Sequence, residues 1–109
     1  MSEIERKAQH NRRVATLRGQ ILRMVYRCQR EAEPTPNHVE LQGALRRMMY
    51  RVSRNEVKDV LTDLRDRGYI TFRIAEDEET GYELWGELLV TPKGRDVVNG
   101  DHSDSAVQM

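Results

Sequence analysis

Apolar residues recur at steps of three and four through the first third of the chain and predict an amphipathic helix. Between residues 14 and 28 this stripe consists of Val14, Leu17, Ile21, Leu22, Val25 and Cys28. Such spacing places one face of a helix against a core. Pro34 and Pro36 are expected to end the helix and open a loop. Residues 1–13 lack the period and are rich in charge, so we expect a basic arm, either disordered or continuing the first helix.

A second helix is predicted to begin near residues 35–37. Pro36 suits a first helical position, and Asn37 with Glu40 has the spacing of a capping pair. The helix is expected to end near Tyr50. Its inward-facing residues are expected to be Leu41, Ala44, Leu45 and Met48.

The third helix, predicted over residues 53–67, has the clearest local signals. Ser53 and Glu56 have the spacing of a capping box, and Val52 and Val57 have that of a hydrophobic staple. Gly68 follows where a helix commonly ends in the left-handed conformation. The inward stripe is expected to consist of Val57, Val60, Leu61 and Leu64.

After Gly68 the period changes from helical to alternating. Ile70, Phe72 and Ile74 share one face of a predicted strand, and a second strand is expected from about residue 82 to 90, with Gly86 as a candidate bulge. An acidic loop at 76–81 joins them into a hairpin. Thr91 and Pro92 should cap a short helix over 93–98, and residues 99–109 are expected to form a disordered tail.

This order of elements predicts an α+β fold, in which the turn at 50–52 sets the third helix across the second. The run SRNEVKDVLTDLRDRGYI, residues 53–70, resembles the recognition helix and first wing strand of winged helix-turn-helix transcriptional regulators. LLVTPKGR, residues 88–95, is similar to their strand-to-helix junction. The resemblance implies a winged helix-turn-helix domain over 14–98: a three-helix core, a two-stranded β-hairpin wing and a short C-terminal helix. Winged helices serve several functions.

In that class the third helix would enter the DNA major groove with its N-terminal half leading. Arg54 and Asn55 can bond bidentately to guanine and adenine, and the other cations can hold phosphates. The alternative is that Arg54 and Lys58 are ordinary solvated residues that pair with neighbouring acids. The predicted DNA-contact set is Arg46, Arg47, Arg51, Ser53, Arg54, Asn55, Lys58 and Thr62.

Charge is distributed unevenly along this chain of 109 residues and zero net charge. Residues 1–30 carry a formal charge of +6, whereas residues 76–109 carry −7. A bipolar surface of this kind can hold a basic face despite its neutral total. The length predicts one domain.

The tip of the predicted hairpin argues against a simple DNA-binding wing, because its acids would be repelled by phosphates. The tip reads Glu76-Asp77-Glu78-Glu79, and Asp59 and Asp63 lie on the presumed reading helix. The side chain of Trp85 is expected to point to the opposite face of the strand from that of Leu84. It is expected to be either an exposed platform for a partner or a partly buried residue. The second hypothesis is therefore a protein-interaction winged helix that uses the acidic wing and Trp85.

No residue pattern predicts catalysis, and we expect neither enzyme activity, a cofactor nor a metal. His10, His38 and His102 are far apart in the sequence and are each expected to be exposed. Ser53 is expected to cap a helix, since no base has a natural place beside it. The single cysteine excludes an internal disulfide.

The remaining expectations concern context. No segment reads as a membrane span or a signal peptide, so a cytoplasmic protein is expected. A homodimer on a two-half-site duplex would be expected of a single recognition helix, formed through the first helix with the arm or through the last helix. The small size suits a stand-alone transcription regulator or a component borne on a phage or mobile element.

Overall fold

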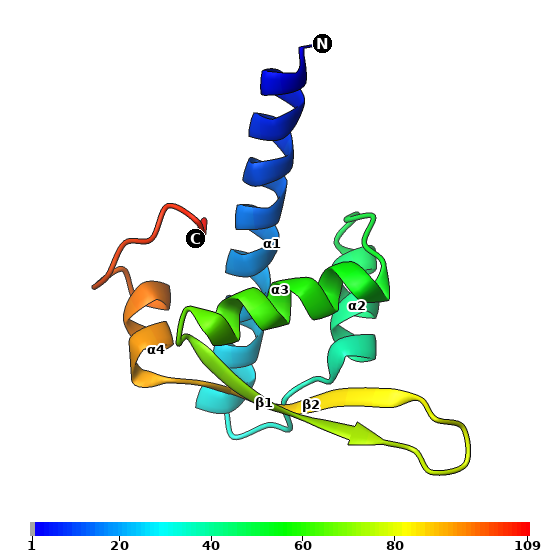
Figure 1. Ribbon diagram of the computed structural model, residues 1–109. Helices are drawn as coiled ribbons and strands as arrows, with labels where there is room; N and C mark the ends of the chain where they lie inside the picture. Colours follow the sequence, from blue (N-terminus) through cyan, green and yellow to red (C-terminus); the bar gives the residue numbers. More distant parts are fainter. Residues whose placement is uncertain (1) are drawn as a thin grey trace.

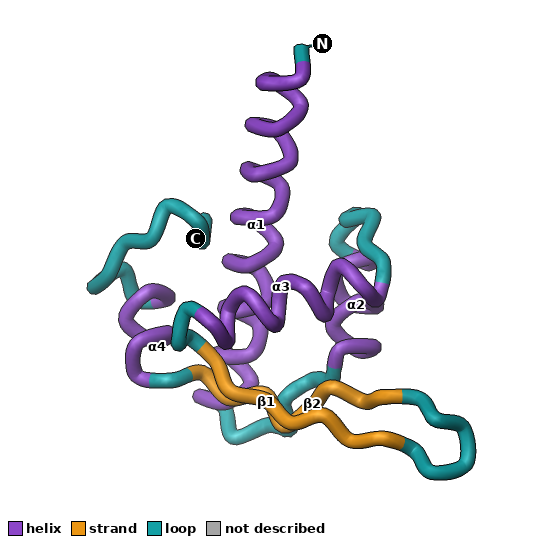
Figure 2. The backbone as a smooth tube through the Cα atoms, in the orientation of Figure 1, coloured by secondary structure: helices purple, strands orange, loops and turns teal. Residues whose placement is uncertain are grey.

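A computed structural model describes residues 2–109 of the chain. The elements follow the order α1 (Glu3–Arg30), α2 (His38–Arg47), α3 (Arg54–Asp66), β1 (Ile70–Glu76), β2 (Glu83–Val90) and α4 (Pro92–Val98). The predicted α+β layout of three helices, a two-stranded antiparallel hairpin and a short C-terminal helix is confirmed (Figure 2).

Helix α1 is longer than its apolar stripe. It begins at Glu3, where the side chain of Ser2 accepts a hydrogen bond from the Glu5 amide at 3.2 Å. Of the two expectations for residues 1–13, the structure has helix over 3–13, and Met1 lies outside the described residues. The first turns of α1 project beyond the rest of the fold (Figure 1).

One hydrophobic core joins α1, α2, α3 and the base of the hairpin. Side chains from every helix meet there, because each presents one apolar face. Val14 and Cys28, expected on the α1 stripe, are only half-buried at its margin. The largest fully buried side chains are Leu17, Ile21, Leu22, Leu41, Leu45, Leu61, Leu64, Ile70 and Leu88.

The end of α2 differs from the expectation. The helix stops at Arg47, and Met48 is its C-cap with 43% of its surface exposed, so Met48 is not a core residue. Met49 then adopts a positive φ of 71° and is 89% exposed. The reversal at Met49 directs the chain back toward α3, and the Tyr50 amide bonds the Leu45 carbonyl at 3.0 Å.

The hairpin carries an irregularity one residue beyond the predicted one. Thr71 pairs with Leu89, whereas Arg73 pairs with Gly86, so β2 has one extra residue between these pairs. Glu87 lies in that interval with a positive φ of 52°. A bulge increases the local twist of a strand. The twisted hairpin starts at the C-terminal end of α3, runs back beneath that helix and extends beyond its N-terminal end (Figure 1).

The expectation of a disordered tail at 99–109 is not met, because this C-terminal segment packs back onto α1. Val107 is 4% exposed within the core, and the Gln108 amide donates to the Ala15 carbonyl at 3.0 Å. The backbone approaches so closely at Gly19 that a Cβ there would overlap the Gln108 carbonyl oxygen. Tertiary contacts rather than local propensity therefore order this segment.

Tyr69 also holds the C-terminal segment, residues 99–109, against the core. Its hydroxyl donates to the carboxylate of Asp104, which also pairs with Arg67 at 3.5 Å. Burial, with this hydrogen bond, raises the pKa of Tyr69 to about 12, and the hydrogen bond lowers the pKa of Asp104. The phenol therefore stays protonated as a donor through the neutral range.

Candidate functional site

The candidate site is the exposed side of α3 together with the hairpin beside it. The capping box predicted for this helix is present: the Glu56 amide donates to Ser53 Oγ at 3.1 Å, and the Ser53 amide donates to Glu56 Oε1 at 3.3 Å. Ser53 is therefore occupied as a helix cap. The cap fixes the first turn of α3, where Arg54 and Asn55 are both exposed.

Two cations of α3 lie over two stacked aromatic rings of the hairpin. Lys58 Nζ is 5.5 Å from the Trp85 ring centre, and the Arg65 guanidinium is 5.1 Å from that of Phe72. The two rings stack with centres 5.1 Å apart. Cations over aromatic faces are attracted by the ring quadrupole. The rings thus hold Lys58 and Arg65 on one side of the helix.

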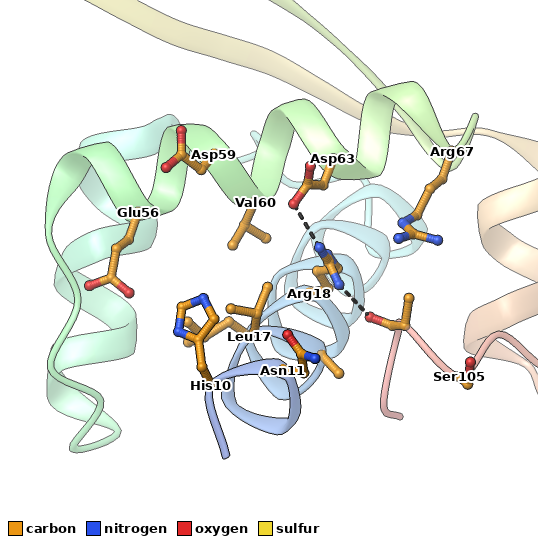
Figure 3. A pocket seen from close by; sticks show the side chains of 13 residues that line it. His10, Asn11, Leu17, Arg18, Glu56, Asp59, Val60, Asp63, Arg67 and Ser105 are labelled. Atoms are coloured by element: carbon orange, nitrogen blue, oxygen red, sulfur yellow. Dashed lines mark hydrogen bonds and ion pairs between the residues drawn. The ribbon is translucent and has the colours of Figure 1, made fainter. Parts of the chain in front are cut away.

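Two acids of α3, Glu56 and Asp63, lie on the opposite side, toward α1, and are paired there (Figure 3). Asp63 Oδ2 accepts from Arg18 at 2.7 Å, and Glu56 pairs with Arg13. The hydrogen bond from Arg13 lowers the pKa of Glu56. Glu56 therefore stays ionised at neutral pH, and the charges of both carboxylates are balanced within the fold.

Asp59 differs from these two acids. It is exposed, and within residues 2–109 it makes no ion pair. Its carboxylate points away from Arg18 in Figure 3. It therefore remains as negative charge near the outer surface of α3.

A cavity of about 540 Å³ separates α3 from α1 and the C-terminal segment (Figure 3). Arg18 crosses it, donating to Asp63 and, at 3.0 Å, to the Ala106 carbonyl. One arginine thus links α1, α3 and the C-terminal segment. The cavity lies behind α3, on the side away from Lys58 and Trp85.

The predicted cations of the α2–α3 connection are brought together only in part. Arg46, Arg51 and Ser53 line one shallow depression, and both arginines are exposed. Arg47 is also exposed but lies beside Gly43 instead. The Arg51 carbonyl accepts from Arg13, which fixes the turn against α1.

Two predicted contact residues are engaged within the fold. Arg54 Nε donates to Gln42 Oε1 at 3.3 Å, while Gln42 Nε2 donates to the Val52 carbonyl at 3.1 Å. Thr62 is half-buried, and its hydroxyl donates to the Lys58 carbonyl at 2.9 Å. Arg54 therefore keeps its terminal nitrogens for a ligand, whereas the hydroxyl proton of Thr62 is already used.

Sequence reasoning missed Arg65 and Phe72 as part of this surface. The available signal was the interval of seven residues between Lys58 and Arg65, which places both on one side of a helix. The positions of the two aromatic rings beneath these cations could not be predicted, because the bulge in β2 determines how Phe72 and Trp85 align across the hairpin. Trp85 was expected to be either exposed or partly buried. It is half-buried beneath Lys58, as the second expectation had it.

His38 was expected to be exposed, and this was wrong. It is 2% exposed, at the start of α2, and its Nδ1 accepts a hydrogen bond from the Trp85 amide at 3.1 Å. Burial, and then the positive charges of Lys58 and Arg54, lower the pKa of His38. Neutral His38 therefore acts as the acceptor that ties the hairpin to α2.

The His38 bond predicts a loss of stability at mildly acidic pH. Because the folded pKa is depressed, the unfolded chain takes up the proton first as the pH falls below about 6.5. We expect the Tm of the wild type to fall between about pH 8 and pH 5.5 by a few degrees more than that of His38→Asn. Asparagine offers a carbonyl acceptor that does not titrate, so an equal fall in both proteins would contradict this role.

The hairpin loop is acidic but partly built by its own acids. Asp77 Oδ1 accepts from the amides of Glu79 at 2.8 Å and Thr80 at 3.2 Å, so Asp77 shapes the turn. Glu83 accepts from Trp85 Nε1 at 3.2 Å. The other loop acids point into solvent, and they would repel a phosphate backbone brought to the tip.

No family model and no curated protein matches this chain. Over residues 2–109, no helix combines the length and apolar character that crossing a membrane requires. Within the same range, no three His, Cys, Asp or Glu side chains are grouped so that they could hold a metal ion.

Proposed function

We propose that the chain is a non-enzymatic winged-helix module that binds duplex DNA through α3, acting in the cytoplasm as a small regulator of transcription. One observation carries the proposal. The cations Arg54, Lys58 and Arg65 share the hairpin side of α3, whereas Glu56 and Asp63 face α1 and are paired there. The helix thus presents more positive charge than its composition suggests.

The proposed roles follow from this placement. Arg54 and Asn55, exposed in the first turn of α3, would reach base edges as the helix enters a major groove. Lys58, Arg65 and the exposed Arg46 and Arg51 would hold phosphates on either side. The acidic hairpin tip would lie outside the duplex.

The test is fluorescence anisotropy of labelled random duplex DNA, at low and moderate salt. Each phosphate contact adds about 0.9 to the salt slope, so losing two contacts weakens binding up to roughly 60-fold at about 0.1 M salt. We expect Lys58→Ala with Arg65→Ala, which removes two of the proposed phosphate contacts, to weaken binding by about that factor and to lower the slope by about 2.

The matched control is Arg23→Ala with Arg27→Ala, which removes two exposed cations from α1 instead. It should bind within about threefold of the wild type, since distant charges are screened. No binding by the wild type at low salt would refute DNA recognition. Equal losses in both variants would move the contact away from α3.

A protein-interaction role is the second candidate, favoured by the outer hairpin. Tyr82 is 75% exposed and Leu84 is 46% exposed among the loop acids. Because Trp85 is covered by Phe72 and Lys58, Tyr82 and Leu84 would form the apolar part of such a contact. Tyr82 and Leu84 line the same groove as Arg54 and Lys58, so a protein bound there would compete with DNA at α3.

A further inference from the structure

Two surfaces of this chain have no partner within residues 2–109, and they are complementary in charge. The first is the N-terminal arm, residues 3–13 of α1. Ile4 is 82% exposed, and Arg6, Lys7 and Arg12 are exposed as well. Apart from Arg13, no side chain of the arm makes an ion pair with another described residue.

The arm continues α1 without a break, so its helix is already nucleated, but its exposed turns gain no stability from packing. Its first turns project past the core (Figure 1), and residues 3–7 are all exposed. A partner that covers one face of the arm would stabilise it.

The second surface is the distal hairpin with the start of α2. A groove of about 560 Å³ lies there, with Val39, Tyr82 and Leu84 among its lining residues. All three are exposed, by 36%, 75% and 46% respectively. An exposed apolar strip on a chain of this size indicates a contact surface.

The hairpin beside this groove is strongly acidic. Residues 74–86 hold five acids and no base. The nearest bases in the sequence are Arg73 before this range and Lys93 after it. Lys58 and Arg54 also line the groove, but Lys58 is held over Trp85 and Arg54 by Gln42. The outer edge of the groove therefore attracts a basic segment.

We infer that the arm of one copy docks against the distal hairpin of a second copy, and that the exchange is reciprocal. The arm and the hairpin tip lie at opposite ends of the molecule, so they cannot meet within one chain (Figure 1). Inverting a second copy brings each arm to the other copy's hairpin. A twofold arrangement of this kind closes and forms the same contact twice.

The charge pattern favours a second copy over a foreign partner. The arm, residues 3–13, carries a formal charge of +2, from four cations against Glu3 and Glu5, whereas residues 74–86 of the hairpin carry −5. Head-to-tail pairing of two such chains matches the basic part of each with the acidic part of the other. The attraction is between exposed charges and is therefore weakened by salt. This inference does not rest on DNA binding, although Arg54 and Lys58 line the same groove, so a docked arm would lie beside the proposed DNA contacts.

The experiment is sedimentation velocity of charge-reversed variants. The arm variant is Arg6→Glu with Lys7→Glu, and the hairpin variant is Glu76→Lys with Glu83→Lys; all four positions are exposed. We expect a dimer of the wild type at about 0.1 M salt that weakens at higher salt. Each variant alone should dissociate at least tenfold more readily. An equimolar mixture should form a heterodimer, because both contacts then join opposite charges.

The control is Glu31→Lys with Glu33→Lys, which makes the same charge change in the loop after α1 and should leave the dimer intact. A wild type that is monomeric at low salt would overturn the inference. So would a hairpin variant that dimerises like the wild type, which would indicate pairing between the arms instead. Circular dichroism of each variant establishes that it is folded, so loss of association is not confused with unfolding.

Discussion

Leu61→Ala is expected to lower the free energy of unfolding by about 3 kcal/mol. Leu61 is 0% exposed, in the cluster where α3 meets α1, α2 and the hairpin. Truncation removes buried methyl groups and leaves a cavity that close packing around it cannot fill. A change of this size is a large part of the 5–15 kcal/mol typical of a whole domain.

Urea denaturation followed by circular dichroism and by Trp85 fluorescence would measure the loss. Trp85 is the only tryptophan and stacks on Phe72, so its emission reports the hairpin, while circular dichroism reports the helices. We expect both probes to shift together, since one core joins these elements.

The matched control is Leu89→Ala, which truncates the same side chain on β2. Leu89 is 51% exposed, so this change should cost less than about 1 kcal/mol. Equal costs for the two substitutions would mean that the cluster around Leu61 is not the centre of the core.

The sequence predicted best where neighbouring residues determine the structure. The Ser53–Glu56 capping box and the stripe ending at Leu64 lie within one helix, so their spacing alone indicates it. The hairpin was also predictable, because alternation at Ile70 and Phe72 followed directly on Gly68. These features set the order of elements and therefore the fold class.

Two predictions were wrong because contacts between distant parts of the chain determine the structure, and a third because a helix ended early. His38 is buried because the Trp85 amide, 47 residues away, bonds to it. The C-terminal segment is polar in composition, yet Val107 enters the core beside α1. Met48 has the spacing of an inward residue, but α2 ends before it and the chain reverses at Met49.

The candidate site was predictable in position but not in charge. Arg54, Asn55 and Lys58 could be assigned to one side of α3 from spacing alone. Whether its acids oppose DNA depends on pairs such as Arg18 with Asp63, which are 45 residues apart. Periodicity places such an acid on a face of the helix but cannot identify the cation that meets it.

Lysines in place of the two exposed acids of α3 are expected to strengthen duplex binding. Asp59 and Asp66 are both exposed; Asp59 has no ion pair within residues 2–109, and Asp66 has only a 3.5 Å contact with the exposed Arg65. If α3 lies in a major groove, these two acids oppose binding. Asp59→Lys with Asp66→Lys should then strengthen duplex binding about 100-fold at about 0.1 M salt, by removing repulsion and adding two phosphate contacts.

Anisotropy titrations over a range of salt would measure the gain, and the salt slope should steepen by about 2. The control Glu31→Lys with Glu33→Lys changes the net charge equally in the loop after α1, and should gain no more than about threefold because of screening. Asp63→Asn should not strengthen binding, since Asp63 faces Arg18 and its charge is already balanced. A gain from Asp63→Asn as large as that from the lysines would mean that α1 contacts the duplex. Equal gains in affinity from both lysine pairs would mean that binding depends only on the net charge of the protein. The duplex would then not lie against α3.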